Sequence, residues 1–389
     1  MTRAVDDILV GLLPTGDQSA LLEACLHSGA RAHRAWARWC AGRPSPAAAI
    51  CQALSASRTL LPLLERSVAR NGLDLQPDVR AYVRAAALRE ELRADRYRRI
   101  AAEAIALLDR AGAAVFVARG AALAAAAYPA WALRHCHDLD LLVERDLTEA
   151  AGVLTRAGFA VPDTGQQRRD GLTLRHGSGL RIALHTRPFA VAHYDVSATA
   201  FAGAGCEFSI DGTPARMPAP AATLVHVLGH ATYSPSRRNL RWATDAWHLV
   251  THCDDLDWGD VVRRLDAYRL ALPVSALLTY LAALGVAVPP EVVADVRARA
   301  AAANPTDEDV ALGGALAAVS GKVGDLWRAA PWPGRLRVGR WAVAPSPAYM
   351  RGEFRPPSAW LLPLCYVYRP VRFLRARLAA RTARPDPEL

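Results

Sequence analysis

Two aspartates stand close together in the segment LRHCHDLDLLVERD, which runs from Leu133 to Asp146. Asp138 and Asp140 are followed at once by a Leu-Leu-Val run that reads as a buried strand. Alternate side chains of a strand share one face, so both carboxylates should point the same way, roughly 6–7 Å apart at Cα. Neighbouring carboxylates repel each other unless a cation neutralises them, and Mg²⁺ or Mn²⁺ prefers such oxygen ligands. The pattern therefore indicates a divalent-metal site, or else two aspartates that face water.

A glycine lies upstream of this pair, at a predicted strand-to-helix turn. Val115-Phe116-Val117 reads as a short strand, Arg119-Gly120 follows it, and an alanine-rich helix then closes at Tyr128-Pro129. The first N–H groups of a helix bind phosphate, and Arg119 and Arg134 add positive charge. We therefore expect Arg119, Gly120 and Arg134 to bind the triphosphate of an NTP, which would be the co-substrate beside the metal.

Helical regions are predicted on both sides of this unit. Apolar residues three and four apart predict helices from about Leu21 to Ala113, and the same spacing returns after Met217. Between them the pattern predicts alternating strands and helices, a hairpin that turns at Gly177-Ser178-Gly179, and a strand pair around Asp211-Gly212. The predicted fold class is α+β, with a helical region over 1–113, an α/β core with a small mixed sheet over 114–217, and a helical region over 218–389.

Composition adds little about partners. The net charge of +10 comes almost wholly from arginine, since Lys322 is the only lysine in a chain rich in alanine and proline. Such a bias is a weak sign of an anionic partner, so RNA is a possible partner that the charge alone does not favour. No stripe of arginines and aromatics is present, apart from an Arg/Trp/Tyr-rich tail from Trp332 to Arg384.

Cysteine spacing and hydropathy favour a cytoplasmic protein. The seven cysteines include no CxxC pair, so neither a zinc site nor a disulfide framework is indicated. The N-terminus has no signal-peptide pattern. Leu270 to Pro290 carries no charge, but its proline, glycine and small polar residues predict a buried helix and no membrane span.

The segment from Ala118 to Phe159 resembles the signature of the bacterial uncharacterised nucleotidyltransferase family, within the DNA polymerase β-like superfamily. In that family Lys-Gly-Ala-Ala-Leu, Tyr-Pro, an arginine, D-[IL]-D-L-L-V and a Gly-Phe or Gly-Tyr ending occur in this order. The present chain reads ARGAALAAAAYPAWALRHCHDLDLLVERDLTEAAGVLTRAGF. Later segments also match, namely Ala183-Leu184-His185, a helix with His230, Arg241-Trp242-Ala243-Thr244-Asp245, and APSPAYM near the C-terminus.

This resemblance implies a nucleotidyltransferase-type sheet and transfer of a nucleoside monophosphate from an NTP to an acceptor, with pyrophosphate leaving. By residue match, Gly120 would hold the triphosphate, while Asp138 and Asp140 would ligate Mg²⁺ or Mn²⁺. The acceptor would be a small molecule or a peptide in a specialised biosynthetic pathway.

The chain departs from the family pattern at two positions. Arg119 replaces the usual lysine, which keeps the charge but changes a point donor to a planar fork. Ala183 stands where relatives commonly place a third carboxylate, two residues before the strand histidine. His185 lies on the same strand face and is expected to ligate metal, to accept a proton, or to be structural. Asp170, Glu144 or Glu207 are other sources of the missing charge, and the spacing selects none of them.

Three interpretations therefore remain open: an active nucleotidyltransferase, a degenerate relative that binds without transfer, and an RNA-directed enzyme. The acceptor site has candidate residues in the C-terminal helical region, namely His230, Arg238, Arg241 and Asp245. His226 and His230 share one helix face, as metal ligands sometimes do, but a structural role or contact with substrate is the more ordinary interpretation. The same spacing relates Arg241 to Asp245, for which helix support is the ordinary interpretation.

Overall fold

The computed structural model shows a mixed α+β protein and describes residues 13–41, 43, 45–51, 55–144, 146–161, 171–189, 196–233, 240–268, 270–302, 344, 347–354 and 356–382. Arg238, Asp170 and most of the tail from Trp332 to Ser346 lie outside these residues. The predicted fold class is confirmed, because a small mixed sheet lies between helical regions at both ends. The three predicted domain boundaries stay a prediction.

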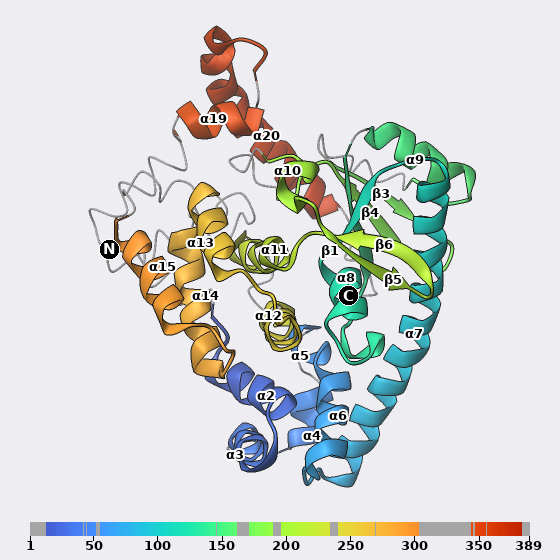
Figure 1. Ribbon diagram of the computed structural model, residues 1–389, viewed down its shortest axis with the longest axis vertical. Helices are drawn as coiled ribbons and strands as arrows, with labels where there is room; N and C mark the ends of the chain where they lie inside the picture. Colours follow the sequence, from blue (N-terminus) through green and yellow to red (C-terminus); the bar gives the residue numbers. More distant parts are fainter. Residues whose placement is uncertain are drawn as a thin grey trace.

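The N-terminal helical region contains six described helices. Helix α2 begins at a capping box, in which Thr15 and Gln18 each accept a hydrogen bond from the other's backbone N–H. The last of the six is 34 residues long, carries charged pairs such as Arg99 with Asp95, and runs along one whole side of the molecule (Figure 1). Their bounds are α2 Gly16–Leu26, α3 Gly29–Cys40, α4 Pro46–Cys51, α5 Ser55–Arg58, α6 Leu61–Asn71 and α7 Pro77–Arg110.

A four-stranded mixed sheet forms the centre of the α/β core. The strand order is β1-β2-β4-β3, with β2 and β4 parallel and the two outer pairs antiparallel. The predicted hairpin through Gly177-Ser178-Gly179 is confirmed as β3 and β4. The elements are β1 Val115–Ala118, α8 Arg119–Ala126, η1 Trp131–Leu133, β2 Asp138–Val143, α9 Leu147–Arg156, β3 Gly171–Arg175 and β4 Arg181–His185.

A short helix and a separate hairpin complete the core. The predicted strand pair around Asp211-Gly212 is confirmed, and it forms a two-stranded sheet of its own beside β1. Gly212 adopts a φ of +77°, in the left-handed region that such a tight turn requires. The elements are α10 Ala198–Ala202, β5 Cys206–Ile210 and β6 Thr213–Met217.

Helices α11 and α12 of the C-terminal helical region lie between the sheet and the first helices (Figure 1), and α11 contacts α8. The uncharged segment predicted as a buried helix is indeed buried, as α14, and ends at Gly285 in the left-handed conformation. Among the described residues, no helix is long and apolar enough to cross a membrane. The elements are α11 Pro220–Tyr233, α12 Arg241–His252, α13 Trp258–Ala267, α14 Ala271–Leu284, α15 Pro290–Ala302, α19 Pro347–Phe354, η2 Ala359–Leu361 and α20 Leu362–Thr382.

The sheet separates two hydrophobic clusters. One face of β2 contributes Leu139, Leu141 and Val143 to a cluster that includes α7, α9 and the neighbouring strands. The opposite face contributes Leu142 to a larger cluster formed by helices from both ends of the chain. Because strand residues alternate, Asp138 and Asp140 lie on the face of Leu142, as predicted. We call this the aspartate face of the sheet.

Candidate active site

Asp140 lies at the centre of the aspartate face with alanine on both sides. In the strand register it pairs with Ala118 of β1 and with Ala183 of β4. The second pairing places Ala183 beside Asp140, at the position where a third carboxylate was expected. His185, two residues farther along β4, brings its Nε2 within 3.1 Å of Asp140 Oδ1. A histidine therefore contacts Asp140 where the neighbouring strand offers no carboxylate.

The Arg119 guanidinium is the second partner of Asp140. Its Nη2 donates to Oδ1 of this carboxylate, whose side chain is only 7% exposed. Burial alone would raise the pKa of Asp140, but the charge of Arg119 and the hydrogen bond with His185 hold it well below its usual value. Asp140 is therefore an ionised carboxylate throughout the physiological pH range.

Asp138 has a different electrostatic environment. Its side chain is 24% exposed, and its Oδ2 lies 3.2 Å from Nε2 of His137. Burial, followed by the negative charge of Asp140, raises the pKa of Asp138 to about 6 against the opposing charges of Arg119 and Arg241. The pKa values of the two carboxylates are thus widely separated. The negative charge at Asp138 is only partly compensated by the described residues.

The turn between β1 and α8 holds Arg119 in an unusual conformation. Its φ is +51°, one of two positive φ angles at non-glycine residues within the described part of the chain. Backbone strain of this kind concentrates at functional sites. The next residue, Gly120, packs against the guanidinium of Arg134, since a Cβ there would lie 2.5 Å from Arg134 Nη1. Glycine at this position therefore allows Arg134 to approach the turn.

Arg134 and Asp245 form a buried ion pair next to the Arg119–Gly120 turn. Arg134 Nε and Nη2 donate to the two carboxylate oxygens of Asp245 at 3.0 and 2.7 Å. The Tyr128 hydroxyl donates to the same carboxylate at 2.8 Å. Burial would lower the pKa of Arg134, but the charge of Asp245 outweighs it and raises this pKa well above its usual value. The pair ties α12 to the segment before β2, so Arg134 and Asp245 have structural partners, and their expected contacts with NTP and acceptor stay predictions.

His137 was not among the residues expected from the sequence, yet it contacts Asp138 directly. Arg241 Nη1 donates to His137 Nδ1 at 3.0 Å and to the carbonyl of His135 at 3.2 Å. A guanidinium only donates, so Nδ1 must accept and the proton must sit on Nε2, which lies 3.2 Å from Oδ2 of Asp138. Only its position directly before Asp138 could have indicated this role, because Arg241 lies on a distant helix.

The remaining expected histidines lie close to the aspartate face. His226 is buried, and its Nε2 lies 2.7 Å from the carbonyl oxygen of Pro188. Burial, with the charge of Arg119, lowers the pKa of His226 to about 3 and that of His230 well below its usual value. Both are therefore neutral. The carbonyl contact supports the structural interpretation of His226, and the acceptor role of His230 stays a prediction.

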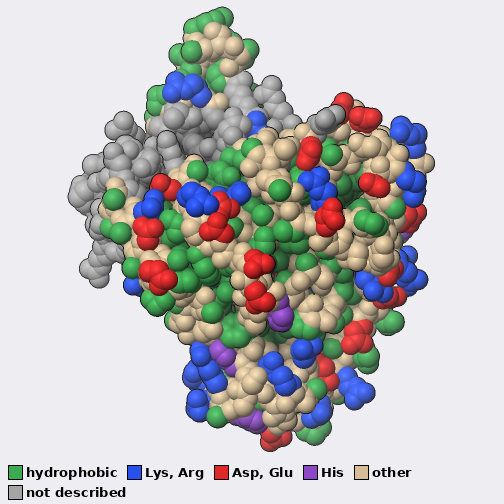
Figure 2. All heavy atoms as spheres, viewed as in Figure 1, with side chains coloured by type: hydrophobic (Ala, Val, Ile, Leu, Met, Phe, Trp, Pro, Cys, Tyr) green, Lys and Arg blue, Asp and Glu red, His purple; other side chains and the backbone are tan. Residues whose placement is uncertain are grey.

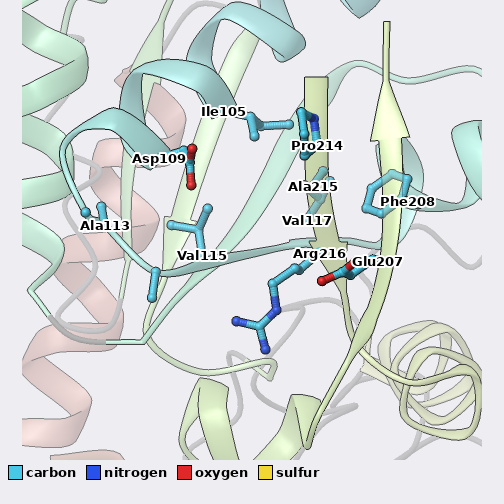
Figure 3. Close-up of a pocket in the computed structure, with 12 residues that line it drawn as sticks. Ile105, Asp109, Ala113, Val115, Val117, Glu207, Phe208, Pro214, Ala215 and Arg216 are labelled. Carbon is cyan, nitrogen blue, oxygen red and sulfur yellow. The ribbon is translucent and has the colours of Figure 1, made fainter. Parts of the chain in front are cut away.

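A cavity of about 440 Å³ lies elsewhere, between the C-terminal end of α7, β1 and the β5–β6 hairpin (Figure 3). Val115 and Val117 line it, and these side chains leave β1 on the face opposite the aspartates. Glu207, one of the suggested replacements for the third carboxylate, also lines this cavity. The cavity is therefore separate from the site, and Glu207 is a poor replacement for that carboxylate.

The mixed sheet presents two aspartates two residues apart, beside an arginine-glycine turn that opens a helix. The α+β fold around them is consistent with a nucleotidyltransferase. The chain belongs to the uncharacterised nucleotidyltransferase family, whose model matches residues 50–285 and so includes the whole sheet and the helices that pack on it. No curated protein matches the chain.

Proposed function

We propose that this protein transfers a nucleoside monophosphate from an NTP to a small-molecule or peptide acceptor, in a specialised biosynthetic pathway. One observation carries the proposal: Asp138 and Asp140 share the aspartate face beside the Arg119–Gly120 turn, and the charge at Asp138 is only partly compensated. A catalytic carboxylate pair that titrates unevenly is typical of a functional site. Family membership supports the same class of reaction.

The carboxylate pair suits a divalent cation whose coordination shell is shared with the substrate. Among the described residues, no group of three His, Cys, Asp or Glu side chains is arranged to hold a metal. Mg²⁺ keeps several waters and commonly binds one or two carboxylates together with phosphate oxygens. Asp138 and Asp140 would therefore hold Mg²⁺ or Mn²⁺ with the NTP. When bound, the cation offsets the charge on the phosphoryl group that is transferred.

The other residues would position the reactants and move a proton. The N-terminus of α8 at Arg119 and Gly120, together with the Arg119 guanidinium, would bind the triphosphate. The acceptor hydroxyl or amine attacks the α-phosphorus, the bond to the bridging oxygen breaks, and pyrophosphate leaves. Because ionised Asp140 accepts from Nε2 of His185, Nδ1 of that ring is the nitrogen left to take the acceptor's proton.

A second candidate function has a specific observation in its favour. Asp140 is already bonded to Arg119 and His185, and Ala183 supplies no third carboxylate. A chain with these features can bind an anionic ligand without transferring a nucleotide. An RNA-directed enzyme is less favoured, because arginines on the visible face alternate with acidic residues instead of forming a stripe (Figure 2).

Calorimetric titration of each NTP with Mg²⁺ tests the proposal. We expect magnesium-dependent binding that weakens at least tenfold in Asp138→Asn/Asp140→Asn, a change that keeps side-chain shape while removing both charges. The matched control is Asp254→Asn/Asp255→Asn, which removes two exposed carboxylates elsewhere and should bind as the natural protein does.

Binding of every NTP by both variants with unchanged affinity would contradict the proposed site. Magnesium-dependent binding without release of pyrophosphate, over a panel of hydroxyl and amine acceptors, would favour the second candidate. Circular dichroism of each variant shows whether a loss of binding reflects a loss of fold.

A further inference from the structure

A row of charged residues crosses three strands on the aspartate face. In the register of β2 and β4, Arg181 lies beside Asp138, and in the register of β4 and β3, Arg175 lies opposite Arg181. Residues paired across neighbouring strands point to the same face. Their neighbours Leu174 and Ile182 belong to the cluster on the other face, which fixes the direction of both arginines. The order across the sheet is therefore Asp138, Arg181, Arg175.

Two arginines directly opposite each other are unfavourable unless an anion lies between them. Arg175 and Arg181 are both exposed. Neither side chain has a carboxylate within ion-pair distance among the described residues, in contrast to Arg119 on the other side of the aspartates. The β-strands thus place two available guanidinium groups next to the site.

The position of this arginine pair indicates which of the two reactants it would contact. Arg119 and Gly120 flank the aspartates from β1, where the proposed function places the triphosphate. Arg181 on β4 and Arg175 on β3 flank them from the other side, where the acceptor must approach if it is to attack in line with the leaving pyrophosphate. Neighbouring strands lie about 4.8 Å apart, so the arginines start roughly 5–10 Å from Asp138 at Cα.

We propose that Arg175 and Arg181 bind an anionic group of the acceptor, a phosphate or a carboxylate, and thereby position its nucleophile over Asp138 and Asp140. This inference rests on the proposed function, in which the acceptor is the molecule that receives the nucleoside monophosphate. Guanidinium groups bind such anions through paired N–H donors, which fixes orientation as well as position. Two arginines fit one anionic group, whereas RNA requires a longer series of phosphate contacts. The acceptor class is therefore a small anionic molecule or a peptide that carries such a group.

Titration of methyl phosphate and of acetate onto the protein, with and without a non-transferable NTP analogue and Mg²⁺, tests this inference. We expect one of the two probes to bind in both conditions, and its Kd to rise at least tenfold in Arg175→Gln/Arg181→Gln. The probe that binds identifies a phosphate or a carboxylate. The matched control, Arg80→Gln/Arg84→Gln, removes two exposed arginines from α7 and should leave the Kd unchanged.

Three results would overturn the inference. Neither probe binds the natural protein; the Kd is the same in the Arg175 and Arg181 variant; or the NTP analogue displaces the probe, which would assign the arginines to the triphosphate. Tight binding of a short RNA that the double variant abolishes, with neither small probe bound, would replace the proposed acceptor class.

The failure of this inference is distinguishable from failure of the proposed function. NTP affinity, measured in the same experiments, reports on Asp138 and Asp140, whereas probe affinity without nucleotide reports on the arginine pair alone. Arg175→Gln/Arg181→Gln should bind NTP as the natural protein does.

Discussion

At the scale of single residues, Gly120 lies at the turn where a phosphate is expected to bind. Its lack of a side chain also permits close packing there. Its φ is not positive, so its backbone would accept a side chain. A side chain at this position is excluded by the Arg134 guanidinium, which lies too close to where a Cβ would be. In this chain Gly120 therefore lies at the N-terminus of α8 and leaves room for the buried Arg134.

Gly120→Ala should lower the free energy of unfolding by about 1–3 kcal/mol, because the new methyl group displaces Arg134 from its place beside Asp245. Urea denaturation measures the change. The matched control is Gly152→Ala within α9, where the nearest atom is 3.4 Å away and the helix interior gains about 0.5–1 kcal/mol from alanine. Equal effects of both substitutions would contradict the packing role of Gly120.

At the scale of elements, the Arg134–Asp245 pair fixes helix α12 against the segment that leads into β2. Both side chains are buried, and Tyr128 at the end of α8 donates to the same carboxylate. Removal of one partner from a buried pair leaves the other charge without compensation, which costs more than the pair contributes as a unit. The geometry of β2 therefore depends on a helix more than one hundred residues away in the chain.

Asp245→Asn should destabilise the protein by about 3–5 kcal/mol, because Arg134 would keep its charge in a buried place. Thermal or urea denaturation measures it. Asp295→Asn removes one of the two carboxylate partners of Arg299 on the exposed side of α15 and should cost less than about 1 kcal/mol. A loss of similar size in both variants would show that Asp245 is not the structural anchor inferred from the hydrogen bonds.

At the scale of the whole molecule, both helical ends of the chain contribute to one hydrophobic cluster on the aspartate face. Two histidines in and beside this region are buried in the neutral form. Burial and the charge of Arg119 lower the pKa of His226 to about 3, and burial together with His252 lowers that of His248 to about 4. Among the described residues neither nitrogen of the buried His248 ring has a hydrogen-bond partner, and this ring lies 4.1 Å from that of Tyr128.

The stability of the protein should therefore fall as the pH falls below about 6.5. Unfolded histidines take up protons near that pH, whereas the folded state resists protonation of His226 and His248 until far lower pH, so acid favours unfolding. Each such histidine should contribute a loss of about 1 kcal/mol between pH 6.5 and 5.5. Urea denaturation at several pH values measures the slope.

His248→Phe provides the internal comparison for this prediction. It removes one titrating group and two unpartnered nitrogens, so it should stabilise the protein by about 1–2 kcal/mol at neutral pH and reduce the slope below pH 6.5. A variant that is less stable at neutral pH and keeps the full slope would show that His248 has a partner or a role outside this account.

Local sequence patterns were sufficient to predict the local features. The strand-turn-helix at Arg119–Gly120, the hairpins, and the shared face of Asp138 and Asp140 follow from periodicity and turn residues, which act within a few positions. The sequence also indicated that Ala183 replaces a carboxylate.

Contacts between distant residues, in contrast, depend on how the separate elements pack. His185 contacts Asp140 across 45 positions and Arg134 meets Asp245 across 111, because β4 pairs in parallel with β2 and α12 packs against the segment before β2. The row of Asp138, Arg181 and Arg175 likewise depends on strand register, which no local pattern specifies. Local spacing thus defined each candidate residue, and only the packing of separate elements determined its partners.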